Sequence, residues 1–396
     1  MKNQVKNNGI YLDYAATTPL DAGVAELMNK INLSVYGNAG SLHTPGRIAK
    51  KYVENARADV AKILGVKPEE IIFTGSGTEA DNLAILGVAR ANRKHGKHII
   101  VSAIEHKAVL EAAVCLEKEG FEVSYAPVDK SGILDMAAFK KLLKKDTILV
   151  SVMFANNEIG TIQPIKEIAK IIKPFKQKTG YPLFHTDACQ AAGALSLDVK
   201  DLSVDLLTIN GSKIYGPKGV GCLYVKNGIN IEPQIVGGSQ EDHRRAGTEN
   251  VSLIMGMAEA LKIATGKQKK ENERLIKLRD YMIKKIKKEI PKVILNGHPT
   301  KRLPNNVNFS FPGVEGEALL LMLDQKKIYC STGSACSSLD LSPSHVLLAI
   351  GLTPELAHGS LRLTLGRDTT RQDLDFTVLN LVKVVSDLRK LSAINI

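Results

Sequence analysis

The sequence of 396 residues predicts an α/β fold around a mostly parallel β-sheet, with a second, smaller α+β domain. Two observations support this prediction. Through the first two thirds of the chain, short apolar runs alternate with amphipathic helical stretches, which is typical of parallel sheets covered by helices. Beyond a long basic stretch, strands and helices follow one another without this regular alternation.

The predicted elements divide the chain into two parts. In the first part we expect strands at 70–74, 98–103, 122–127, 147–153, 183–186, 205–209 and 220–225, and helices at 47–64, 79–94, 108–118, 136–143, 165–178 and 252–264. In the second part we expect strands at 293–295, 307–311 and 360–365, and helices at 316–325, 342–349 and 370–391. The elements predict a large domain over residues 15–265. A small domain is predicted from residues 1–14 and 266–396.

The composition is that of an ordinary globular protein, with 44% hydrophobic and 24% charged residues. The formal net charge of +12 gathers partly in residues 267–290, where apolar side chains recur at helical spacing. We expect a helix with a solvated basic face there. The alternative is a surface that binds an acidic partner or RNA. The absence of Trp argues against a stacking platform for single-stranded nucleic acid.

Targeting and metal-binding signals are missing from the sequence. No apolar run approaches the roughly 20 residues that span a bilayer, and the N-terminus has no apolar signal core. The five cysteines are scattered and form no C-x-x-C pair, so thiols are expected rather than a zinc site. These observations predict a cytoplasmic protein without a membrane segment or a metal.

A glycine-rich turn follows the first predicted strand and opens a helix. Backbone N–H groups and the helix dipole at such a turn bind phosphate, and the hydroxyl of Thr78 adds a donor. The spacing of Gly75, Gly77 and Ala80 also fits a loose dinucleotide-binding pattern, with the acidic Glu105 ending the next strand. A tight turn without a ligand is the third interpretation.

Two ionisable residues follow other predicted strands. Lys213 lies beyond strand 205–209 among Gly, Ser and Pro residues, and a partly buried lysine amine forms imines and then acts as a base. Asp187 follows strand 183–186, where a carboxylate serves a cofactor or merely caps a loop. A solvated loop lysine is the alternative for Lys213.

The segment from Cys330 to Ser338 is made of small and polar residues. Such a composition predicts a mobile loop. An exposed thiol on a loop is unfavourable to keep unless its reactivity is used, so Cys336 is a candidate nucleophile. An incidental loop cysteine is the alternative.

Together these motifs resemble the longer-loop subgroup of the cysteine desulfurase family of fold-type-I pyridoxal-phosphate enzymes. The resemblance runs from Tyr11–Thr18 to Ser360–Leu363. It also includes the segments 156–160, 213–219, 245–248 and 334–336. So many matches in the same order are a specific signal, whereas each motif alone is weak.

The resemblance implies the catalytic roles. Lys213 is similar to the Schiff-base lysine, and Asp187 to the partner of the pyridine nitrogen. His106 is similar to the residue that stacks on the ring and moves protons. Arg362 is similar to the clamp on the substrate carboxylate, and Cys336 to the cysteine that forms a persulfide.

The resemblance also implies how pyridoxal 5'-phosphate is bound. Gly77 and Thr78 would hold the phosphate, while Gln190 and Asn157 would lie near the ring hydroxyl, with Asn157 also near the substrate. Thr248 resembles a phosphate contact donated by the other subunit, which implies a homodimer with shared active sites.

Two cofactor-binding positions depart from the family pattern. Ser212 stands where the family usually has His, and Asn210 stands where it commonly has Ser. Both positions normally help to hold the phosphate. Ser212 still offers a hydroxyl donor but brings no ring, so a weaker hold on the cofactor is expected.

The implied function is the removal of sulfur from L-cysteine, which gives L-alanine and a persulfide on Cys336. Sulfur would then pass to an acceptor protein, an iron–sulfur scaffold or a tRNA-thiolation relay, without direct nucleic-acid binding. A selenocysteine lyase, or another pyridoxal-phosphate lyase or aminotransferase, is the first alternative. An NAD-dependent dehydrogenase leaves Lys213, Asp187 and Cys336 without a role, and an RNA-binding protein rests on the charge alone.

Overall fold

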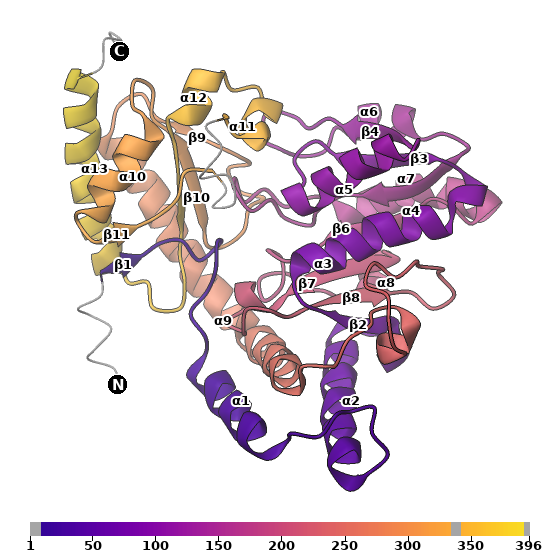
Figure 1. Ribbon diagram of the computed structural model, residues 1–396. Helices are drawn as coiled ribbons and strands as arrows, with labels where there is room; N and C mark the ends of the chain where they lie inside the picture. Colours follow the sequence, from indigo (N-terminus) through magenta and orange to yellow (C-terminus); the bar gives the residue numbers. More distant parts are fainter. Residues whose placement is uncertain (1–8, 334–341, 392–396) are drawn as a thin grey trace.

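A seven-stranded sheet forms the centre of the larger part of the computed structural model, which describes residues 9–333 and 342–391 (Figure 1). Its order is β2-β8-β7-β6-β5-β3-β4. The strands are β2 (Ile71–Thr74), β3 (His98–Ser102), β4 (Glu122–Ala126), β5 (Thr147–Ser151), β6 (Leu183–Asp187), β7 (Leu206–Asn210) and β8 (Gly221–Val225). Each lies within two residues of its predicted position.

The direction of each strand follows from its connection. The strands from β3 to β7 pair in parallel because helices connect them in sequence. Strand β8 is antiparallel to both β7 and β2, since a short segment without a crossover helix leads back from β7. The sequence therefore predicted the mostly parallel sheet correctly.

Helices cover both faces of this sheet. They are α1 (Ala22–Ser34), α2 (Thr44–Leu64), α3 (Gly77–Asn82), α4 (Val88–Ala91), α5 (Lys107–Lys118), α6 (Met136–Leu142), α7 (Ile165–Thr179) and α8 (Val199–Leu202), with a π-helical segment Leu83–Gly87 between α3 and α4. Alternate strand residues face opposite sides. Ile71 and Phe73 pack with α2 and α7, while Ile72 packs with the α3–α4 segment and α5.

A second apolar core lies beside the first. It is built from β9 (Ile294–Leu295), β10 (Asn306–Ser310), β11 (Ile328–Tyr329), β12 (Ser360–Thr364), α10 (Gly316–Asp324) and α13 (Arg371–Leu391). Short helices α11 (His345–Ala349) and α12 (Pro354–His358) flank it. Strand β10 pairs with β9 and β12, and the N-terminal strand β1 (Ile10–Tyr11) pairs in parallel with β11.

The long helix α9 (Val251–Glu289) joins the two cores (Figure 1). Met257 belongs to the first core and Met282 to the second. The expectation of two separate helices, 252–264 and 267–290, is therefore wrong. A single glycine, Gly266, costs a helix only about 1 kcal/mol, and each half is anchored by its own core. The division at residue 265 stays a prediction, because this helix crosses it without a break.

None of the helices that the structure describes is both long and apolar enough to cross a membrane.

Candidate active site

A cavity lies at the carboxyl ends of the parallel strands, the edge where α/β sheets bind their ligands. Nine residues that the sequence singled out line it: Gly77, Thr78, His106, Asn157, Asp187, Gln190, Asn210, Lys213 and Arg362. They come from the ends of β2, β3, β5, β6 and β7 and from β12. The fold thus brings together side chains separated by up to 285 residues in the sequence.

Lys213 stands where β7 gives way to a 3-10 turn, Gly211–Lys213. Its Nζ donates to the backbone oxygens of Ala15 at 2.9 Å and Ala16 at 2.5 Å. The Ala15 oxygen also accepts from Nε2 of Gln190 at 2.9 Å. The N-terminal segment therefore closes one wall of the cavity and fixes the position of the amine.

Asn210 and Ser212 form a local pair in this turn. Oδ1 of Asn210 accepts from the backbone N–H of Ser212 at 3.2 Å and from its hydroxyl at 3.3 Å. The Ser212 carbonyl accepts from the backbone and the hydroxyl of Thr18, both at 2.9 Å. Ser212 does not line the cavity. The two departures from the family pattern thus contact each other.

Asp187 ends β6 with only 6% of its surface exposed, and its Oδ1 accepts from the N–H of Cys189 at 2.8 Å. Two further buried ionisable groups support this region. Burial, reinforced by the charge of Asp187, raises the pKa of Asp81 well above its ordinary value. Burial lowers the pKa of His185 to about 4, so this ring is neutral between the hydroxyls of Ser151 (2.9 Å) and Thr208 (3.1 Å).

Glu105 is fully buried and does not line the cavity. Its Oε1 accepts from the Ser102 hydroxyl at 2.5 Å and from the Met153 N–H at 2.6 Å. Burial nevertheless raises its pKa to about 8. The folded protein keeps this proton up to pH about 8, whereas the unfolded chain loses it near the ordinary value of 4.5, so Glu105 lowers stability progressively as the pH rises between these values. A carboxyl held in this way is not placed as a dinucleotide-binding acid.

The start of α3 faces the cavity through Gly77 and Thr78. A Cβ atom at Gly77 would lie 2.9 Å from Sγ of Cys189 and 3.1 Å from Cβ of Asn210. Only glycine therefore fits without a shift of its neighbours. Glu79 in the same turn accepts from the Gly75 N–H at 2.8 Å and forms an ion pair with Arg245 at 2.8 Å. These two contacts stabilise the turn.

His106 caps the N-terminus of α5. Its Nδ1 accepts from the backbone N–H of Ala108 at 3.1 Å. Because this nitrogen is an acceptor, the proton of the neutral ring sits on Nε2. The helix cap thus selects one tautomer of a half-buried ring that lines the cavity.

Arg362 is the largest fully buried side chain in the part of the chain that the structure describes, with 1% exposed. Its guanidinium donates to Oδ1 of Asp13 at 2.7 Å and to the Asn157 carbonyl at 3.1 Å. Its Nε has no hydrogen-bond partner among the described residues. A buried cationic N–H without an acceptor, in a cavity wall, suits an anionic ligand such as a carboxylate.

Besides Ser212, one further predicted residue that the structure describes does not line the cavity: Thr248, which is exposed. Cys336 falls in 334–341, outside the described residues. Described residues on either side of that segment are hydrogen-bonded near the cavity. Ser331 exchanges two backbone hydrogen bonds with Arg362, at 3.2 and 2.7 Å, and the Ser344 hydroxyl donates to Glu158 at 2.6 Å.

The sequence did not single out several residues that line the cavity. They are Ala15, Ala16, Asp81, Met153 and Cys189. The alanines act through backbone oxygens, which no side-chain motif reveals. Cys189 is buried, and burial raises the pKa of its thiol well above the ordinary value, so it is a poor thiolate nucleophile.

The sheet order and the position of the cavity define the class of this protein as a fold-type-I α/β enzyme. The family model of aminotransferase class V matches residues 10–376, a range that contains every residue of the cavity.

Within that class, the chain belongs to the cysteine desulfurase family. It is 53% identical to "Cysteine desulfurase IscS" of Dictyoglomus turgidum over 97% of this chain and 96% of the relative. The solved structure of a "NIFS-LIKE PROTEIN" is similar with a TM-score of 0.89 at 37% identity, over 96% of this chain and all of that one. "SspA in complex with cysteine" is similar with a TM-score of 0.78 at 33% identity, over 90% and 98% of the two chains. These are families of pyridoxal-phosphate-dependent enzymes.

Proposed function

We propose that this cysteine desulfurase binds pyridoxal 5'-phosphate in the cavity and transfers sulfur from L-cysteine to Cys336. The Cβ–S bond of the substrate breaks and an S–S bond forms, so that L-cysteine and the Cys336 thiol give L-alanine and a persulfide. The observation that carries the proposal is that one cavity holds both the Lys213 amine and the buried Arg362, whose Nε has no hydrogen-bond partner within residues 9–333 and 342–391. A related protein is described in complex with cysteine.

The residues present fit the cofactor. The narrow site at Gly77, with Thr78 beside it at the start of α3, suits the phosphate, and Asp187 suits the ring nitrogen. Asn157 and Gln190 would lie near the ring hydroxyl. Bound pyridoxal phosphate supplies an electron-accepting ring that stabilises negative charge on the substrate carbon next to the amino group.

The remaining chemistry belongs to the side chains. Lys213 would hold the cofactor covalently through Nζ and, once released, take the proton from the substrate carbon. The two alanine carbonyls keep that nitrogen at the cavity wall. His106 would donate a proton through Nε2, the nitrogen that its cap leaves protonated.

Arg362 would bind the carboxylate of the substrate. Asp13 and the Asn157 carbonyl hold the guanidinium in place, so little orientation is lost when a ligand binds. The Nε–H, which no described residue accepts from, offers the charge-assisted hydrogen bond that a carboxylate accepts.

The position of Cys336 in the sequence supports it as the sulfur acceptor. Cys336 follows Gly333, the last described residue before it, by three positions in the sequence. A Cβ at Gly333 would lie 3.3 Å from the carboxylate of Glu158, the neighbour of the cavity residue Asn157. On the other side, His345 contacts the Glu105 carbonyl at 3.0 Å.

The proposed function also includes a homodimer and a protein that accepts the sulfur. We infer that Thr248, which is exposed and does not line its own cavity, contacts the phosphate in a second subunit of a homodimer. The persulfide would pass to an acceptor protein of an iron–sulfur scaffold or a tRNA-thiolation relay, in the cytoplasm.

Two variants test the proposal. Lys213→Ala should lose both alanine formation from L-cysteine and the visible absorbance of lysine-bound pyridoxal phosphate. Cys336→Ser should keep that absorbance and form no protein persulfide. Sulfide release by Cys336→Ser at the wild-type rate would show that another group receives the sulfur.

A further inference from the structure

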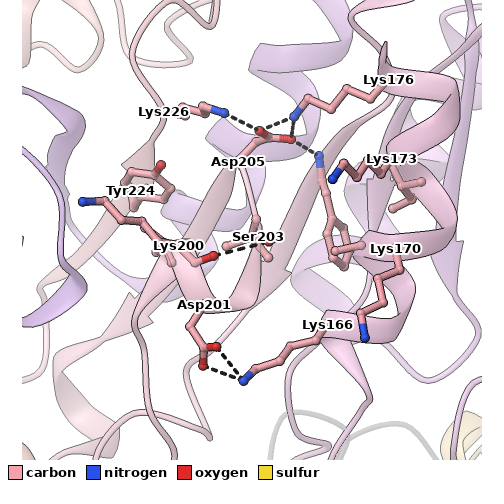
Figure 2. Close-up of a pocket in the computed structure, with 15 residues that line it drawn as sticks. Lys166, Lys170, Lys173, Lys176, Lys200, Asp201, Ser203, Asp205, Tyr224 and Lys226 are labelled. Atoms are coloured by element: carbon pink, nitrogen blue, oxygen red, sulfur yellow. Dashed lines mark hydrogen bonds and ion pairs between the residues drawn. The ribbon is translucent and has the colours of Figure 1, made fainter. Parts of the chain in front are cut away.

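A groove lined by lysines lies outside the cavity (Figure 2). It has a volume of about 740 Å³ and runs between α7 on one side and α8 with the ends of β7 and β8 on the other. Six lysines line it: Lys166, Lys170, Lys173 and Lys176 from α7, and Lys200 and Lys226 from the opposite side. The positive charge therefore flanks the groove on both sides.

Two aspartates in the groove are already engaged. Asp205 is paired with Lys176 and, at 3.8 Å, with Lys226, and it also accepts from the Phe184 N–H at 2.9 Å. Asp201 is paired with Lys166 at 2.6 Å. Figure 2 shows these contacts at the two ends of the groove. Their negative charge is thus taken up by three of the six lysines.

The other three lysines are exposed and have no ion pair or hydrogen bond of the side chain among the described residues: Lys170, Lys173 and Lys200. Six lysines against two aspartates leave the groove an excess of four positive charges. Like charges held near one another repel, so a ligand that brings carboxylates or phosphates is favoured there.

The residues at the floor of the groove favour a protein over a nucleic acid as its ligand. It is apolar, with Ile172, Phe184, Val204 and Tyr224 all buried. The lining residues include no arginine and no exposed aromatic ring on which a base could stack. An apolar floor between lysines fits a peptide that carries both acidic and aliphatic side chains.

The spacing on α7 sets the length of such a ligand. From Lys166 to Lys176 the helix rises roughly 15 Å, the length of about five residues of extended chain. A second copy of this chain is disfavoured as the occupant, because each copy carries a net charge of +12.

We propose that this groove is the docking site for an acidic, partly aliphatic segment of a partner protein. The groove and the cavity share no lining residue. Binding in the groove can therefore be measured whether or not the chain turns over cysteine.

The test compares two triple variants of the full-length protein with the same change of charge. The groove variant is Lys170→Glu, Lys173→Glu and Lys200→Glu. The control variant is Lys277→Glu, Lys284→Glu and Lys288→Glu, three exposed lysines of α9. A fluorescein-labelled Glu/Leu peptide is titrated by fluorescence anisotropy at low salt. A Gln/Leu peptide of equal length measures binding that does not depend on charge.

The groove variant should bind the Glu/Leu peptide at least about tenfold more weakly than the wild type, while the control variant should change affinity no more than about twofold. Equal weakening in both variants would overturn the proposal, because binding would then follow net charge. Tighter binding of a labelled RNA than of the peptide, lost in the groove variant, would also overturn it in favour of nucleic acid. The corresponding Lys→Gln triple provides the same comparison if the glutamate variant fails to fold.

Discussion

His106 combines two roles that substitution can separate. Its Nδ1 caps α5 through the Ala108 N–H at 3.1 Å, and its ring lines the cavity. Asparagine retains an acceptor for the cap but has no titratable nitrogen. His106→Asn should therefore keep the free energy of unfolding within a few tenths of a kcal/mol, whereas His106→Ala should lose about 1 kcal/mol through the missing cap.

Activity should respond differently from stability. A general acid contributes about 10²- to 10⁴-fold to a rate. Both variants should therefore lose at least about a hundredfold in alanine formation, and the loss should be similar in the two. Urea unfolding gives the stability and a coupled alanine assay gives the rate. If His106→Asn turned over cysteine within a factor of about two of the wild type, proton transfer by this ring would be refuted.

Three further predictions concern the surroundings of the cavity. Glu105→Gln retains the oxygen that accepts from Ser102 and Met153. Its free energy of unfolding in urea should exceed the wild-type value, and this difference should grow from pH 4.5 to about 8 and stay constant above pH 8. A constant margin would contradict the protonated carboxyl. Arg362→Lys should raise KM for L-cysteine by about ten- to a hundredfold, since lysine lacks the planar fork; an unchanged KM would remove this residue from the substrate site. Asn210→Ala should release pyridoxal phosphate more readily on dialysis, because the turn before Lys213 loses both bonds to Oδ1; wild-type retention would show that the pair is dispensable.

The strands, and the ionisable residues that follow them, could be predicted from the sequence. Buried strands such as β3 and β5 each contain a continuous apolar run of three residues, and the residues that follow parallel strands meet at one edge of the sheet. This is why Asp187 and Lys213 could be recognised as candidate site residues from strand ends, whereas Asn157 came from the family resemblance; all three line the cavity.

Features that depend on contacts between residues far apart in the sequence could not be predicted. Asp81 lies on α3, which packs against β7 and β8, and its buried carboxylate lies 3.7 Å from Nε2 of His185. The carbonyls of Ala15 and Ala16 reach Lys213 because the N-terminal segment crosses back to the sheet. The continuity of α9 likewise follows from two cores that anchor one helix.

Ser212, the residue before Lys213, has contacts that its sequence position did not indicate. Ser212 departs from the family pattern, which suggested a weaker hold on the phosphate. In the structure its hydroxyl and N–H both contact Asn210, the other departure, and Ser212 itself does not line the cavity. The two residues therefore stabilise the turn together, a relation that sequence spacing alone did not indicate.

Transfer of labelled sulfur in a single turnover shows directly whether Cys336 receives the sulfur of L-cysteine. The holoenzyme is mixed with substoichiometric ³⁵S-cysteine, quenched, alkylated without reductant and digested. One alanine should form for each cysteine consumed, and the label should appear on the peptide that contains Cys336. Alanine formation with the label on another cysteine, or with all of it released as free sulfide before any label appears on Cys336, would contradict sulfur transfer to Cys336.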